Sequence, residues 1–303
     1  MSENCNKDCS NCSEDCAERN GCTHDCSTCD QNCEERNDCT HDCSSCGHSC
    51  GERIEIVPTS DTHIKKIVGV LSGKGGVGKS MVSSLLAVEL AQKGYKVGIM
   101  DADITGPSIP KMFNLNSQLY GDEIGIFPAV SQLGIEVVSV NMMVEKEDTP
   151  LLWRGPILGG VIRQFYTEVH WGDLDFLLID MPPGTSDVAI SVIQEIPVDE
   201  FVMVTTPSKL VSMVVGKAIN MAKEVNKPIT GLVENMAFVK CDECGHEINI
   251  YSEDDTPATA EKYGLEILGR LPIDPAIANQ ADNGCIEEYD GIYLEALVEK
   301  LAQ

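Results

Sequence analysis

The stretch that most constrains the fold of this chain is a glycine-rich loop, GKGGVGKS, at residues 73–80. Residues 64–71 before it form a short apolar run rich in β-branched residues, which predicts a strand. After the loop, apolar and small residues such as Ser83 and Leu90 repeat at helical spacing until Gly94, a typical helix stop. A strand, this loop and a helix in that order match G-x-x-x-x-G-K-[ST], in which backbone N–H groups and the helix N-terminus bind nucleotide phosphates.

The loop pattern predicts roles for individual residues. Lys79 is expected to reach the β- and γ-phosphates, and Ser80 is expected to bind Mg²⁺. A second lysine, Lys74, directly follows the first glycine. The predicted nucleotide-binding residues of the loop are Gly73, Lys74, Gly75, Gly76, Val77, Gly78, Lys79 and Ser80.

Carboxylates follow two further apolar runs. YKVGIMDAD ends in Asp101 and Asp103, and LDFLLID ends in Asp180. Because the carboxyl ends of parallel strands face one crevice, these acids are expected beside the phosphate loop. We expect Asp180 to hold Mg²⁺ through water, Asp103 to position the attacking water and Asp101 to lie close to the metal; the alternative for each is a cap of a turn at a strand end. The predicted catalytic residues are Lys74, Lys79, Asp103 and Asp180, and the predicted magnesium residues are Ser80, Asp101 and Asp180.

Strand and helix patterns alternate through the rest of the chain. Further strands are predicted at 200–207, 229–235 and 266–274, and helices near 157–169, 185–195, 208–225, 256–263 and 292–302. This alternation predicts an α/β fold with a doubly wound, predominantly parallel sheet. Residues 60–303 are thus expected to form one P-loop NTPase domain.

The loop and several later strings together resemble a known group of ATPases. GKGGVGK resembles the deviant Walker A loop of the nitrogenase iron protein, MinD/ParA and Mrp group, which has the SIMIBI type of P-loop fold. DADITGPSIP, WRGP, DLDFLLIDMPPGTSD, VTTPSKLV, GLVENMAF, CDECG and LPIDPAI then occur in the order seen in Mrp/ApbC-type iron–sulfur cluster carrier ATPases. The resemblance covers about residues 64–285. It implies an ATP-dependent homodimer in which Lys74 crosses to the partner's nucleotide.

The same resemblance implies two more functional positions. Asn235 matches the asparagine that contacts adenine, although it also suits the end of a strand. Cys241 and Cys244 match a C-x-x-C that meets its symmetry mate, so that four thiolates hold one bridging [4Fe–4S] cluster; zinc ligation and uncoordinated thiols are the alternatives. The family's switch regions fall on residues 101–108 and 180–187.

Residues 1–55 contain three tandem 17-residue units, each with the spacing C-x3-C-x2-C-x3-C. This acidic segment has almost no aliphatic residues, so it cannot bury a core of its own. The chain shows no secretory signal and no membrane-spanning run, which favours the cytoplasm and metal or cluster ligation over disulfides; the alternative is an unliganded, thiol-rich tail. The possible N-terminal metal ligands are Cys5, Cys9, Cys12, Cys16, Cys22, Cys26, Cys29, Cys33, Cys39, Cys43, Cys46 and Cys50.

The whole chain of 303 residues has a formal net charge of −26. Such an acidic surface argues against nucleic acid or an anionic membrane as a partner, because both are bound mainly through clustered Lys and Arg. With the resemblance, the sequence predicts a slow ATPase that uses ATP and Mg²⁺, carries a [4Fe–4S] cluster in a homodimer and passes it to apoproteins. The alternatives are an ATP-dependent reductase like the nitrogenase iron protein, a MinD/ParA-type positioning ATPase and a metal-storage protein.

Overall fold

A computed structural model describes residues 57–303, except 104–107, 116–117, 123–124, 144–154, 185–186, 242 and 252–253. All the described residues belong to the compact unit Ile56–Gln303. The N-terminal cysteine repeats lie outside the described residues, so metal ligation by those cysteines stays a prediction.

A sheet of eight strands runs through the unit in the order β12-β9-β8-β1-β7-β2-β6-β5. Neighbouring strands pair in parallel except β5 and β6, which are antiparallel. This mostly parallel sheet confirms the predicted α/β class. The strands are β1 His63–Ser72, β2 Val97–Asp101, β5 Ala129–Val130, β6 Glu136–Ser139, β7 Asp173–Asp180, β8 Glu200–Thr205, β9 Ile229–Glu234 and β12 Ile267–Arg270.

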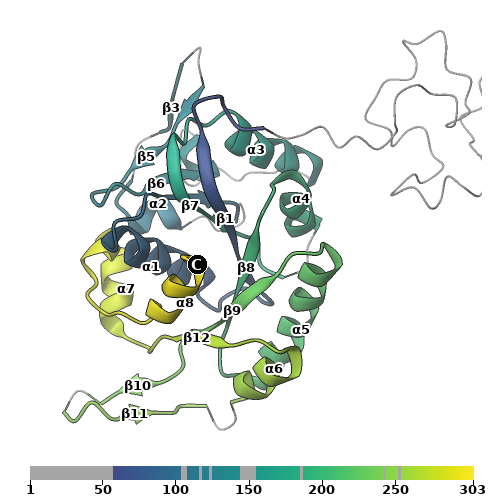
Figure 1. Cartoon of the computed structure of the whole chain (residues 1–303). Helices are drawn as coiled ribbons and strands as arrows, with labels where there is room; N and C mark the ends of the chain where they lie inside the picture. Colours follow the sequence, from purple (N-terminus) through teal and green to yellow (C-terminus); the bar gives the residue numbers. More distant parts are fainter. Residues whose placement is uncertain are drawn as a thin grey trace, which may run out of the picture. The chain divides into compact units, whose positions relative to one another are not determined.

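Helices cover both faces of the sheet, as Figure 1 shows. One face carries α1 Lys79–Gln92, α2 Ile109–Met112, α7 Pro275–Asp282 and α8 Glu295–Leu301. The other carries α3 Gly155–Thr167, α4 Asp187–Glu195, α5 Lys209–Glu224 and α6 Thr256–Tyr263. The described residues also include the 3₁₀ turns η4 Val140–Met143 and η5 Ile286–Glu288. None of the helices in the described part is both long and apolar enough to cross a membrane.

The core lies between the sheet and these two helical layers. The central strand β7 contains a continuous apolar run, residues 176–179, in which Leu177, Leu178 and Ile179 are fully buried, as expected for a parallel strand covered on both faces. Helix α1 is buried all round from Val82 to Leu90 because α2, α8 and η5 pack over its outer side. The helix that begins at the phosphate loop is therefore central to the fold.

Two short antiparallel pairs lie outside the main sheet. Strands β3 Tyr120–Gly121 and β4 Ile126–Phe127 form one, and β10 Val239–Lys240 and β11 Glu247–Ile248 form the other. The β10–β11 hairpin extends away from the sheet edge at β12 (Figure 1).

The predicted helices agree with the structure to within three residues at each end. The four-residue helix α2 was not predicted, and neither was helix α7. Its N-terminus carries a recognisable signal: the Asp274 side chain accepts a hydrogen bond of 2.8 Å from Ala276 N, and Pro275 occupies the first turn. The short strands β3, β4, β5, β6, β10 and β11 were also not predicted, because runs of two to four residues show no clear alternation.

Candidate functional site

The glycine-rich loop follows strand β1 and leads into helix α1, as the sequence predicts. A pocket of about 320 Å³ opens over the loop, and its wall includes Lys74, Lys79, Ser80 and Asp103. Because β2 and β7 flank this side of the sheet in parallel with β1, their carboxyl ends bring acids to the same place.

Two glycines allow the loop its shape. Gly76 and Gly78 have φ angles of 80° and 77°, in the left-handed region that favours glycine. A Cβ at Gly76 would point into open space, whereas a Cβ at Gly78 would overlap the Asn235 amide nitrogen. Gly78 is therefore needed for both its conformation and the close approach of Asn235.

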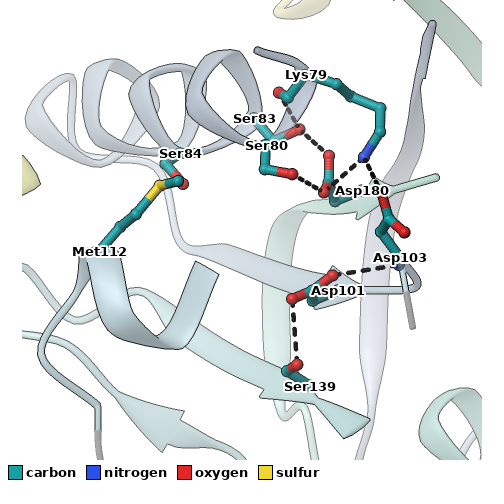
Figure 2. Close-up of polar contacts among 9 residues, drawn as sticks. All are labelled: Lys79, Ser80, Ser83, Ser84, Asp101, Asp103, Met112, Ser139 and Asp180. Carbon is teal, nitrogen blue, oxygen red and sulfur yellow. Dashed lines mark hydrogen bonds and ion pairs between the residues drawn. The ribbon is translucent and has the colours of Figure 1, made fainter. Parts of the chain in front are cut away.

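Figure 2 shows a buried charge cluster at the start of α1. Lys79 Nζ lies 2.7 Å from Asp180 Oδ2 and 3.6 Å from Asp103 Oδ2. Ser80 Oγ donates to Asp180 Oδ2 at 2.6 Å, and Ser83 Oγ donates to Asp180 Oδ1 at 2.7 Å. Both carboxylate oxygens of the fully buried Asp180 thus have partners, which offsets the cost of burying its charge.

Asp101 lies on the next strand, β2, and is also buried. Its Oδ2 accepts from Ser139 Oγ at 3.1 Å, and its Oδ1 accepts from the backbone N–H of Asp103 at 3.2 Å (Figure 2). Burial, reinforced by the nearby carboxylate of Asp180, raises the pKa of Asp101 to about 8. A cation at this position would oppose that shift and stabilise both carboxylates.

The pocket residues fit a nucleotide with a divalent cation. Lys79 Nζ is buried and forms two ion pairs, yet it makes no aligned hydrogen bond within the described residues, so it has donors for phosphate oxygens. A serine hydroxyl and two carboxylates are oxygen ligands of the kind that Mg²⁺ prefers. Ser80, Asp101 and Asp180 are therefore the residues that would hold the ion, directly or through water.

Asn235 and Lys74 occupy contrasting positions around the loop. Asn235 is buried, and its Nδ2 donates to the Val77 carbonyl at 2.9 Å, so it braces the phosphate loop. Contact of Asn235 with adenine remains a prediction. Lys74 is exposed and forms no ion pair with another described residue, which leaves its ammonium available to a partner.

Cys241 and Cys244 lie in the turn between β10 and β11, and both are thiols. The turn is closed by hydrogen bonds from Cys241 N to the His246 carbonyl at 3.0 Å and from Gly245 N to the Cys241 carbonyl at 2.8 Å. Cys244 is exposed and Cys241 is half-buried. No group of three or more His, Cys, Asp or Glu side chains suited to a metal ion occurs within the described residues.

The structure thus brings the loop lysine, Ser80 and the three predicted acids together. Residues 104–107 and 185–186 of the expected switch regions lie outside the described residues. Sequence reasoning missed Ser83 and Ser139, which bond the acids. Ser83 stands one turn after Lys79, so the helical period places it beside the loop, whereas Ser139 ends a strand that was not predicted.

The chain is similar in sequence to iron–sulfur cluster carrier proteins. The family model for the NUBPL iron-transfer P-loop NTPase matches residues 63–302. An iron–sulfur cluster carrier protein of Clostridium perfringens is 46% identical over 239 residues, which cover 76% of this chain and 84% of the relative. One of Saccharolobus solfataricus is 47% identical over 224 residues, which cover 73% of this chain and 76% of the relative.

Solved structures show the same fold. The nucleotide-binding protein of Archaeoglobus fulgidus in complex with ADP, in which cobalt was found, has a TM-score of 0.68 at 41% identity over 75% of this chain and 90% of that one. The cell division ATPase MinD of Pyrococcus furiosus has a TM-score of 0.57 at 21% identity over 78% of this chain and 97% of that one, a likeness of fold. The family match and the identity to the carrier proteins lead to one conclusion: the chain belongs to the NUBPL iron-transfer P-loop NTPase family.

Proposed function

We propose that this protein is an ATP-dependent carrier of iron–sulfur clusters that acts in the cytoplasm as a homodimer. Each copy contributes Cys241 and Cys244 to one bridging [4Fe–4S] cluster, which is then passed to an apoprotein. The family membership and the carrier names of the relatives support this function.

The observation that carries the proposal is the path of the chain after strand β9. Asn235 directly follows β9 and donates to the phosphate loop at Val77. The same segment then continues into the β10–β11 hairpin, which holds Cys241 and Cys244. A single short segment therefore joins the phosphate site to the cysteine pair, as a nucleotide-controlled carrier requires.

The cysteine pair also fits a site shared by two copies. Two thiolates supply half of the ligands of a [4Fe–4S] cluster, and a two-fold axis supplies the other half. The exposure of Cys244 leaves its sulfur accessible from outside the chain. A cluster bound in this way lies between copies, where it can be released when they move apart.

The pocket residues would bind and orient the nucleotide. ATP with Mg²⁺ supplies the phosphoryl group whose hydrolysis, slow in this proposal, drives the change of state. The loop N–H groups bind the phosphates, Lys79 neutralises their charge and Asp103 orients water. When a phosphate oxygen binds Lys79, the ion pair between Lys79 and Asp180 is weakened, and Asp180 becomes available to the cation. Lys74, which is exposed, would reach the nucleotide of the partner copy.

Anaerobic reconstitution of the full-length protein with iron and sulfide tests this function. We expect the double variant Cys241→Ser/Cys244→Ser to bind about four fewer irons and sulfides per dimer than the wild type. Cys285→Ser is the matched control, because Cys285 is the third described cysteine and lies outside the hairpin. Transfer is then followed by mixing loaded protein with an apo-acceptor and measuring the acceptor's iron and sulfide.

Equal iron and sulfide in the wild type and the double variant would overturn the proposal, as would a loaded protein that stays monomeric with ATP in light scattering. A cluster that survives repeated oxidation and reduction but never reaches the acceptor would indicate a reductase instead.

A further inference from the structure

Arg270, the last residue of the edge strand β12, contacts both the neighbouring strand β9 and the cysteine hairpin. Its Nε donates to Glu234 Oε2 at 2.9 Å, and its guanidinium lies 3.8 Å from Glu247 Oε2. Glu234 is the last residue of β9 and Glu247 is the first of β11. One planar cation therefore faces a carboxylate of the sheet and a carboxylate of the hairpin, and its fork of donors suits such a double contact.

The two carboxylates hold Arg270 differently. The Glu234 side chain is 1% exposed, whereas that of Glu247 is 49% exposed. Burial, together with the nearby Asp254, raises the pKa of Glu234 above its ordinary value, and the Thr256 and Arg270 side chains oppose this shift. Because a buried carboxylate without its cation is costly, Arg270 is fixed on the sheet side and its contact with Glu247 is the adjustable one.

The base of the hairpin packs on the same guanidinium. Arg270 lies over the ring of Phe238, with 5.6 Å between the guanidinium carbon and the ring centroid. Phe238 is the residue before β10, and its carbonyl accepts from Ile273 N at 2.7 Å. Both strands of the hairpin are thus linked to the end of β12, the first through Phe238 and the second through Glu247.

On the other side, Glu234 is the neighbour of the residue that braces the phosphate loop. Asn235 Nδ2 donates to Val77 O at 2.9 Å, and Asn235 N donates to Thr205 O at 2.8 Å. The Asn235 amide packs so closely on Gly78 that a Cβ there would overlap it, so a displacement of the loop would be transmitted to Asn235. Such a displacement would reach Glu234, the preceding residue, and Arg270, which is hydrogen-bonded to it.

The backbone between the two sites is strained. Met236 has φ +56°, a left-handed conformation that is rare for a long side chain, and its N–H donates to Asn235 Oδ1 at 2.9 Å. A strained residue persists only where its surroundings hold it, and strain of this kind collects at switch regions. Met236 lies between the brace on the phosphate loop and the first strand of the hairpin.

We infer that Arg270 is a positioning residue that couples the state of the phosphate loop to the geometry of the Cys241/Cys244 hairpin. The inference rests on the proposed function. Nucleotide binding shifts Asn235, the shift passes through Glu234 to Arg270, and Arg270 moves the hairpin through Glu247 and Phe238. Because proximity alone does not establish coupling, the test measures the coupling itself.

Alkylation of Cys244 by iodoacetamide reports the state of the hairpin in the full-length protein. Peptide mapping by mass spectrometry gives its rate with and without ADP, and Cys285 in the same digest is the internal control. In the wild type we expect ADP to change the Cys244 rate at least about fivefold, the lower end of typical couplings between sites. In Arg270→Met we expect the ratio to fall close to one while ADP affinity, measured by calorimetry, is retained.

Three further variants separate coupling from folding. Glu247→Gln removes only the half-exposed contact, so it should keep the fold and reduce the ratio. Arg270→Lys keeps the charge but not the fork, and a partial ratio is expected. Lys65→Met breaks an exposed pair with Asp175, 2.7 Å apart and away from the hairpin, and should leave the ratio unchanged.

The inference would be overturned if folded Arg270→Met or Glu247→Gln showed the same ratio of alkylation rates as the wild type. It would also be overturned if ADP did not change the rate of Cys244 alkylation in the wild type. Both results leave cluster loading by Cys241 and Cys244 intact, so they are distinct from failure of the proposed function, which appears as equal iron in the cysteine variants.

Discussion

The phosphate-loop site and the cysteine hairpin are built in opposite ways. Lys79 and Asp180 are 5% and 0% exposed, and each carboxylate oxygen of Asp180 accepts a hydrogen bond from a serine of α1. The hairpin has two strands of two residues each, and Cys244 at its turn is exposed. The first site lies in the core and is held by ion pairs and hydrogen bonds; the second projects from the sheet and is linked to the end of β12 near its base.

Because of this difference, the free energy of nucleotide binding arises at the buried site, whereas the change in geometry occurs at the exposed hairpin. Exchanging the partners of a buried carboxylate changes the free energy of the protein by several kcal/mol, because water cannot solvate the charge when a partner is lost. An exposed turn can change its geometry at small cost. Nucleotide binding at the loop can therefore supply the energy, and the hairpin can respond without unfolding the sheet.

Lys79→Ala is expected to have the largest effect. It leaves the buried Asp180 without a cation, which should lower the free energy of unfolding of the nucleotide-free protein by about 3–5 kcal/mol. It also removes a charged donor to phosphate, which should weaken ATP binding about 10- to 100-fold. Urea unfolding and titration calorimetry measure the two changes.

Lys74→Ala is the matched control, since Lys74 belongs to the same loop but is exposed. Its free energy of unfolding should stay within about 0.5 kcal/mol of the wild type. Equal losses in the two variants would contradict the contrast between buried and exposed lysines.

Ser83→Ala tests the second support of Asp180. Ser83 Oγ donates to Asp180 Oδ1 at 2.7 Å in a fully buried position, so its removal should cost about 1–3 kcal/mol of unfolding free energy. Ser84→Ala is the control. Ser84 is equally buried, but its hydroxyl contacts the weak acceptor Met112 Sδ at 3.5 Å. A larger loss of unfolding free energy in Ser84→Ala than in Ser83→Ala would show that packing, and not the hydrogen bond to Asp180, determines the cost of the substitution.

A pH titration probes the main sheet, on which the phosphate-loop site is built, through Glu136 on β6. Burial raises the pKa of Glu136 to about 7 from an ordinary value of 4.5, and Lys96 opposes the shift. Between these values the folded state keeps a proton that the unfolded state has lost, so this group's contribution to stability falls as pH rises from 4.5 to 7. The slope should be below about 1.4 kcal/mol per pH unit, the limit for a difference of one proton between the folded and unfolded states.

Glu136→Gln should remove this part of the pH dependence. Urea unfolding of both proteins between pH 4.5 and 8 gives the difference, in which other carboxyl groups cancel. Parallel profiles would show that Glu136 titrates normally in the folded state.

The sequence predicted the phosphate-loop site and the central strands well, but it predicted little of the hairpin structure. The central parallel strands contain continuous apolar runs, and the loop pattern fixes the positions of Lys79 and Ser80 after β1. Asp180 could be placed because it ends such a run. Ser83 was harder to recognise as functional, since α1 is buried all round and has no polar face against which a buried serine stands out.

The contacts at the hairpin base join residues that are distant in sequence. Arg270 and Glu234 are 36 positions apart, and no local pattern indicates that β12 would pair beside β9 in this register. The strands β10 and β11 are too short for alternation to be visible. The cysteine pair was found through its resemblance to a family motif; its place at the end of a projecting turn needed the structure.

The smallest effect is expected on the hairpin itself. Cys244 is exposed, and the turn is closed by backbone hydrogen bonds of Cys241 and Gly245 in which the Cys244 side chain takes no part. Cys244→Ser should therefore change the unfolding free energy by less than about 0.5 kcal/mol. Cys285→Ser, at a half-buried thiol 3.6 Å from the Asn283 carbonyl, should cost at least as much.

The two sites would then differ in kind: Lys79→Ala would disturb folding and nucleotide binding together, whereas Cys244→Ser would affect the cargo and leave the fold intact. If Cys244→Ser instead lowered the unfolding free energy of the unloaded protein as much as Ser83→Ala, the hairpin would be part of the cooperative core. A nucleotide could then move it only by loosening the sheet, and the separation between a fixed site and an adjustable one would fail.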